Sequence, residues 1–209
     1  MSCSAASRRS AGRRTRLPSL CPSRAARRRA HLAFAEDARL RQDEHGPWDW
    51  TPEVSHPIGE GERVVADAVM HYTLVESEQR RKLRAFVEVD RTTMSSERLA
   101  VKLIEYARLF HYEAQPVSRR KQAGAGPAWQ RWYPAFPRVL FVLTGASRGR
   151  LENRMRDLQA MVAQHPLVAG LAREVQLGAA VLEDLEQHGP AQAVWIPLTG
   201  GRPRAWFEL

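Results

Sequence analysis

Two carboxylates lie two residues apart in an apolar run that has the alternation of a β-strand. In the segment 84–90, Glu88 and Asp90 share one face because side chains alternate along a strand. Burying such carboxylates is costly unless a cation or a metal compensates them. Asp67, inside the apolar run of the preceding strand, would join them across a hairpin. Three converging carboxylates predict a site for a divalent cation such as Mg²⁺, held by Asp67 and Glu88 and assisted by Asp90, that could orient water for phosphodiester hydrolysis.

A lysine in the next segment strengthens this prediction. Leu99, Leu103, Tyr106 and Phe110 recur with a helical period and form one apolar stripe. At a turn of about 100° per residue, Lys102 lies inside that stripe rather than on the solvent face. A lysine on a core-facing stripe needs a partner, and the acidic strand before it is the nearest candidate. Lys102 would then stabilise charge on a phosphate.

A structural interpretation of the same residues stays open beside the catalytic one. Asp67 could cap a turn, and Lys102 could extend to the solvent edge. The two acids of the strand could form ordinary ion pairs. The candidate partners are Arg63, Arg84 and Arg91.

The elements that would position these residues follow from the hydrophobic periodicity. We expect helices over 30–44, 95–112, 147–164 and 182–188, strands over 48–51, 63–72, 84–90, 138–144 and 174–181, and a last extended piece over 194–198. The glycine-, proline- and arginine-rich segment 113–136 is expected to be a long loop. This order predicts an α/β domain over 31–209, with a mixed central sheet flanked by helices.

The net charge of +9 is not spread evenly along the chain. Nine arginines and no acid lie in residues 1–30, so that residues 31–209 hold 23 basic and 23 acidic residues. We expect residues 1–30 to be a disordered tail. The tail is interpreted either as a basic arm for nucleic acid or as the product of a truncation or a wrong start.

Several classes of protein are excluded by composition. The sequence has no run of the roughly 18 apolar residues that a membrane span needs, and no secretory signal follows the arginines. Both cysteines, Cys3 and Cys21, lie in the tail, which excludes a cysteine metal site in the domain. A cytoplasmic protein with no membrane partner is expected.

Aromatic and basic side chains alternate at the end of the long loop. They could form a platform on which exposed bases stack, or they could simply cover the core. The residues are Trp129, Arg131, Trp132, Tyr133, Phe136 and Arg138.

An Asp on one hairpin strand, a Glu on the next and a Lys on the following helix resemble the PD-(D/E)xK nuclease-like fold. Asp67 matches the first acid and Glu88 the second, whereas Asp90 stands at the usual position of the lysine. Lys102 lies where some branches of that superfamily place it. The resemblance implies a restriction-endonuclease-like sheet and a magnesium-dependent DNA endonuclease or nickase.

Three runs are more specifically similar to the replication-relaxation family of bacterial plasmids and mobile elements. They are 66–69, 85–92 and 97–106, with further similarity in 133–145 and 181–185. The resemblance implies DNA as a partner, together with replication or mobilisation proteins, in plasmid replication, relaxation or mobilisation. It also implies an N-terminal winged helix, in whose place this chain has the arginine-rich segment. The alternative function is a catalytically inactive nuclease-like module that binds DNA or a replication protein.

Overall fold

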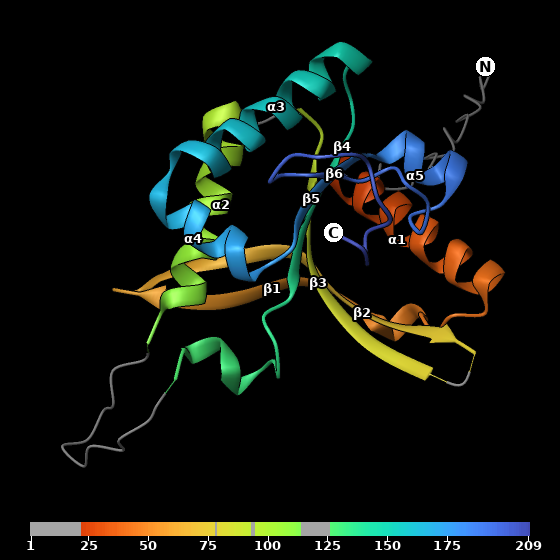
Figure 1. The fold of residues 1–209 in the computed structure, drawn as a ribbon, viewed down its shortest axis with the longest axis horizontal. Helices are drawn as coiled ribbons and strands as arrows, with labels where there is room; N and C mark the ends of the chain where they lie inside the picture. Colours follow the sequence, from red (N-terminus) through yellow and green to blue (C-terminus); the bar gives the residue numbers. More distant parts are fainter. Residues whose placement is uncertain (1–21, 78, 93–94, 114–125) are drawn as a thin grey trace, which may run out of the picture.

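Figure 1 shows a computed structural model of the chain, which describes residues 22–77, 79–92, 95–113 and 126–209. The helices are α1 (Pro22–Arg41), α2 (Ser96–His111), α3 (Arg148–Gln164), α4 (Pro166–Glu174) and α5 (Leu182–His188), with 3₁₀ helices η1 (Pro47–Asp49) and η2 (Ala128–Arg131). The strands are β1 (Trp50–Gly59), β2 (Glu62–Glu76), β3 (Gln79–Asp90), β4 (Arg138–Leu143), β5 (Leu177–Val181) and β6 (Ile196–Pro197).

The strands form one mixed sheet in the order β1-β2-β3-β4-β5-β6. β1, β2 and β3 are antiparallel neighbours, β3, β4 and β5 are parallel, and β6 is antiparallel to β5. Parallel neighbours need crossover connections, and these contain α2 between β3 and β4, and α3 and α4 between β4 and β5. The expected α/β class with a mixed sheet is confirmed.

The sheet separates two hydrophobic cores. On one face Phe86 and Phe141 pack beneath α2, α3 and α4. On the other face Phe34 of α1 packs with Trp195 and Trp206 from the C-terminal segment. Figure 1 shows α2, α3 and α4 on one side of the sheet and α1 and α5 on the other. Two-sided cover explains why β4 and β5 are almost continuously apolar.

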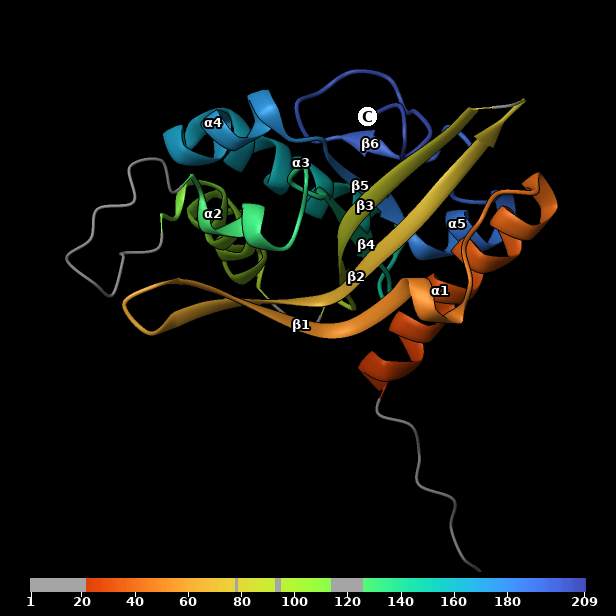
Figure 2. The same cartoon turned by 90° about the horizontal axis from the view of Figure 1, so that it is seen from below.

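At Asp67 the side chains of β2 change the face of the sheet on which they pack. Before this residue Val64 and Ala66 pack in the core beneath α2, whereas after it Ala68 and Met70 pack in the core beneath α1. The paired register of β2 with β3 begins at Ala68, although β1 remains paired with β2 on both sides of Asp67. In Figure 2 the ribbon of β1 and the first half of β2 runs away from β3, and the second half of β2 runs with β3.

The first helix begins earlier than predicted. α1 starts at Pro22 rather than at residue 30, because Ala26 and Ala30 are buried against the sheet. The prediction of a disordered tail is therefore wrong for residues 22–30, while residues 1–21 lie outside the described part. Arg27 and Arg29 of this stretch form ion pairs with acids of β1, β2 and α5.

The hairpin strands are longer than predicted, and one helix was not expected. β1 extends to Gly59 instead of ending at residue 51, β2 continues to Glu76, and β3 begins at Gln79, within the segment 76–82 that was expected to be a charged turn. α4 fills a segment with no predicted element. Within the described ranges, no helix has both the length and the apolar character that crossing a membrane requires.

Candidate functional site

β3 presents Glu88 and Asp90 to the face that α2 and α3 cover. Val87 and Val89 pack in the opposite core, while Phe86 packs beneath α2. Glu88 is 4% exposed and Asp90 is 2% exposed. The two carboxylates therefore share a face, as the alternation predicts, and both are buried deeply enough to require compensation of their charge.

Glu88 lies in a buried polar cluster with two residues of α2. The Tyr106 hydroxyl donates a hydrogen bond of 2.5 Å to Glu88 Oε1, and Lys102 Nζ lies 3.5 Å from the same oxygen. Burial raises the pKa of Glu88 to about 7 against the opposing charge of Lys102, and nearby Asp67 adds to the rise. Glu88 can thus gain or lose a proton near neutral pH, as a general acid or base must.

Lys102 contacts Glu88 because α2 turns it towards the sheet. The Ser95 side chain caps the start of this helix and fixes its first turn. Lys102 Nζ donates to the Val65 carbonyl oxygen at 2.6 Å and lies 3.7 Å from Glu105. The expectation that this lysine finds a partner on the acidic strand is confirmed.

Asp67 lies where β2 and β3 separate, and its carboxylate binds on two sides. Asp67 Oδ2 accepts a hydrogen bond of 2.9 Å from the Val89 backbone N–H, next in sequence to Glu88. Asp67 Oδ1 accepts one of 2.8 Å from Arg27 of α1. Arg27 also pairs with Glu53 of β1 at 3.0 Å. Glu53 has a left-handed backbone with φ 55°, an uncommon conformation for a residue other than glycine.

Asp90 is paired with a different helix. Arg154 Nε of α3 donates to Asp90 Oδ2 at 2.7 Å, and the side chains of Asp90 and Arg154 are 1% and 11% exposed. Asp90 Oδ1 is buried and accepts no hydrogen bond from the described residues. This pair connects α3 to the carboxyl end of β3, whereas the partners of Glu88 lie on α2.

The three predicted acids are thus paired with three different cations. The structure brings Glu88 and Lys102 together, places Asp67 beside them, and assigns Asp90 to Arg154. Tyr106 is a member of the site that sequence reasoning treated only as a core residue. Its position four residues after Lys102 was a usable signal, because residues i and i+4 of a helix are neighbours and a buried tyrosine hydroxyl needs a partner.

Magnesium is the cofactor that the carboxylates predict, and their present contacts compete with it. Among the described residues, no group of three or more His, Cys, Asp or Glu is placed to hold a metal ion. Both oxygens of Asp67 have donors, and Glu88 Oε1 has Tyr106 and Lys102. A cation bound by Asp67 and Glu88 would have to displace positively charged or hydroxyl donors, and the arrangement shown does not fit a magnesium ion.

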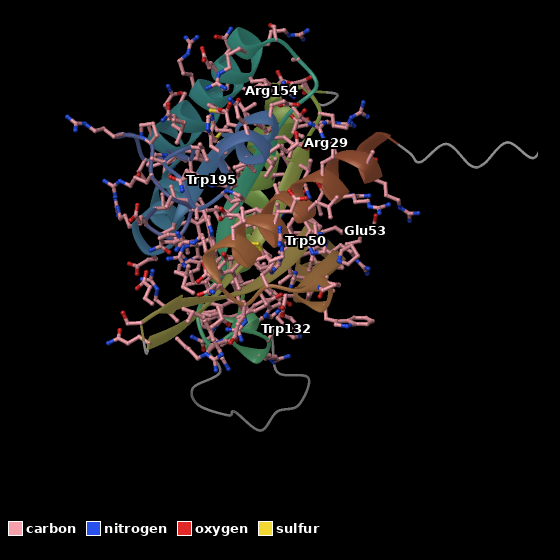
Figure 3. The ribbon with its side chains drawn as sticks, turned by 90° about the vertical axis from the view of Figure 1, so that its right-hand side faces the viewer. Arg29, Trp50, Glu53, Trp132, Arg154 and Trp195 are labelled. Atoms are coloured by element: carbon pink, nitrogen blue, oxygen red, sulfur yellow. The ribbon has the colours of Figure 1, made fainter. Side chains whose placement is uncertain are left out.

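The aromatic residues before β4 do not all fit the same predicted role, since some cover the core and one is exposed. Trp129 and Tyr133 are buried and cover the core, with Phe136 partly buried beside them. Trp132 is 46% exposed and lies at the opposite end of the molecule from Arg154 in Figure 3. The segment therefore covers the core with most of its aromatic rings and leaves one indole open.

Comparison with known protein families identifies a match over more than half of the chain. Residues 2–121 match the replication-relaxation family. This range contains Asp67, Glu88, Asp90 and Lys102, and it ends before β4. No curated protein and no solved structure matches the chain.

Proposed function

Because this chain belongs to the replication-relaxation family, we propose that it binds DNA in plasmid replication or mobilisation as a PD-(D/E)xK-like module that does not cut DNA. The observation that carries the proposal is the separate pairing of the three acids. Asp67 is held by Arg27, Glu88 by Lys102 and Asp90 by Arg154. Each of the three carboxylates thus has a cationic partner in the protein, so that none is left as an unpaired charge that only a metal could compensate.

The PD-(D/E)xK-like part of the proposal has its own support. Asp67 and Glu88 flank the point at which two sheet strands separate, and Asp67 contacts the backbone next to Glu88. Lys102, on the helix that follows β3, lies 3.5 Å from Glu88. Along the chain, Asp67, Glu88 and Lys102 follow the order acid, acid, lysine that the resemblance to the PD-(D/E)xK fold implies.

A magnesium-dependent nickase is the second candidate function. Lys102 next to Glu88, with Asp67 close enough to raise the pKa of Glu88, favours it. In that candidate Asp67 and Glu88 would hold the metal, Asp90 would assist, and Lys102 would stabilise charge on the phosphate. It requires that Arg27 and Lys102 give up their present contacts with the carboxylates.

Nicking of supercoiled plasmid separates the two candidates. The intact chain, the Glu88→Ala variant and a Glu97→Ala control, whose carboxylate is exposed on α2, are incubated with Mg²⁺ or with EDTA. We expect equal, background levels of nicked plasmid in all samples. Magnesium-dependent nicking that disappears in Glu88→Ala and persists in Glu97→Ala would show that the non-cutting proposal is wrong and that the nickase candidate is right.

Fluorescence anisotropy with labelled DNA tests the binding part of the proposal. We expect the intact chain to bind duplex or single-stranded DNA with an affinity that decreases as salt increases, because cationic side chains displace counterions from phosphates. Absence of binding to either form at low salt would overturn the proposed function, whatever the result of the nicking assay.

A further inference from the structure

The far half of the β2–β3 hairpin has one covered face and one open face. Tyr72, Leu74 and Leu83 are buried against α1 and the C-terminal segment. Residues of the other face are half-buried or exposed. Cross-strand pairing places them opposite one another, as His71 with Arg84, Thr73 with Lys82 and Val75 with Arg80.

The open face carries cations that the described structure does not neutralise. Lys82 and Arg84 form no ion pair with any described acid, although Arg80 at the hairpin end pairs with Glu44. Arg84 Nε is buried and has no hydrogen-bond acceptor among the described residues. A buried guanidinium N–H without an acceptor costs free energy, and the positive charge of Arg84 has no counterion among the described residues.

One further acid borders this face and does not cancel its charge. Asp49 lies near His71, where it opposes the lowering of the histidine pKa by burial and by Arg84. The Asp49 carboxylate already accepts a hydrogen bond from the Gly46 N–H. Lys82 and Arg84 therefore remain available on the adjoining strand.

An exposed indole lies near the Arg84 end of this face, because Tyr133, next to Trp132 in sequence, packs on Phe86. The rings of Trp132 and His56 are in edge-to-face contact, with their centroids 5.4 Å apart. The neighbouring Tyr133 hydroxyl forms a hydrogen bond of 2.8 Å with His56 Nε2. Arg84 is close enough to Tyr133 to oppose the burial that raises the tyrosine pKa to about 12. The adjacent Arg131 is also exposed. Trp132 is thus held in place by its buried neighbours while its ring stays open (Figure 3).

We infer that this surface, the hairpin platform of Lys82, Arg84, Arg131 and Trp132, binds single-stranded DNA. The inference rests on the proposed DNA-binding function and names the surface that performs it. Cations bind phosphates of either DNA form, but an indole can stack only on a base that is not already stacked in a duplex. The combination of an open aromatic ring with unneutralised cations on a sheet face therefore selects single strands.

Binding of a labelled oligo(dT) and of a duplex of the same length by the full chain tests this assignment. Trp132→Ala should weaken oligo(dT) binding about tenfold or more, since stacking of each base is a substantial part of such affinity, and should leave duplex binding nearly unchanged. Lys82→Gln and Arg84→Gln together should make the slope of log affinity against log salt shallower by about 1.4. Lys82→Gln alone covers the case in which the Arg84 variant folds poorly, because Lys82 is exposed.

Two matched control variants change residues that do not belong to the hairpin platform. Trp48 is 93% exposed before β1 and Arg150 is exposed on α3, so that Trp48→Ala and Arg150→Gln should bind as the intact chain does. If the intact chain binds DNA but Trp132→Ala has no more effect than Trp48→Ala, or weakens duplex binding equally, the inference is wrong and the proposed function stands. If the intact chain binds neither form, the proposed function and the inference are both wrong.

Discussion

At the scale of single residues, Glu88 has the clearest consequence for stability. Its pKa of about 7 lies above the ordinary value of 4.5, so between these pH values the folded chain binds a proton that the unfolded chain releases. The folded state therefore gains most from Glu88 below pH 4.5 and loses this contribution as the pH rises through 7. The loss is at most about 3 kcal/mol, at roughly 1.4 kcal/mol per pH unit.

We predict that Glu88→Gln removes this part of the pH dependence. From pH 5 to pH 8 the intact chain should lose free energy of unfolding that the variant retains, so the variant should become more stable relative to the intact chain. Urea denaturation at several pH values measures it, and Glu97→Gln, which alters an exposed carboxylate of α2, should give parallel curves. Parallel curves for Glu88→Gln as well would contradict the assignment of the raised pKa.

The sequence predicts part of this residue-level arrangement for physical reasons. Lys102 and Glu88 are predictable because helical and strand periodicity fix the faces on which they lie. Arg154 is not predictable as the partner of Asp90, since the two residues are 64 positions apart and only the packing of α3 brings them together. Arg27 is not predictable as the partner of Asp67 because it is one of many arginines in a segment with little apolar periodicity.

At the scale of elements, the Asp90–Arg154 pair connects β3 to α3. We predict that Arg154→Met lowers the free energy of unfolding by about 3 kcal/mol, because it leaves a buried carboxylate without its counterion. Urea denaturation at neutral pH measures the change. Arg156→Met, an exposed position of the same helix, should change stability by no more than about 0.5 kcal/mol.

The double variant Asp90→Asn/Arg154→Met distinguishes the ion pair from simple packing of the arginine stem. Removing both charges should recover part of the loss, since no buried charge is then left unpaired. A double variant that is as unstable as the sum of the two single variants would mean that the arginine acts through packing alone.

How each element is buried explains whether its bounds can be predicted from the sequence. β4 is found close to its predicted bounds because it is covered on both faces, which requires a continuous apolar run in the sequence. β1 is an edge strand whose Pro52 and Pro57 resemble a turn, although proline is tolerated at a sheet edge. α1 contacts the sheet mainly through alanines, which give a weak periodic signal.

At the scale of the whole molecule, the structure divides the arginine-rich N-terminal segment into two parts. Arg24, Arg27, Arg28 and Arg29 belong to α1, and the family match begins at residue 2 and includes the whole segment. The remaining five arginines precede residue 22. Part of the charge of the segment is therefore structural, carried by the ion pairs of Arg27 and Arg29, whereas the five arginines before residue 22 lie outside the described residues.

Two deletions test the contributions of residues 1–21 and of residues 22–30 separately. Removing residues 1–21 should leave the melting temperature nearly unchanged, whereas removing residues 1–30 should lower it strongly or prevent folding. The longer deletion takes away buried Ala26 and the ion pairs of Arg27 and Arg29, which leaves Asp67 without its counterion. Differential scanning calorimetry or thermal denaturation followed by circular dichroism measures both.

The shorter deletion also locates the DNA contacts. If the hairpin platform is the main single-strand site, the chain without residues 1–21 still binds oligo(dT), and Trp132→Ala weakens that binding as it does in the intact chain. Its salt slope becomes shallower by at most about 3.5, the contribution of five arginines to a single strand. Complete loss of binding with an unchanged melting temperature would instead assign DNA binding to the segment before α1. The sheet would then serve to position that segment rather than to bind DNA through its own cations.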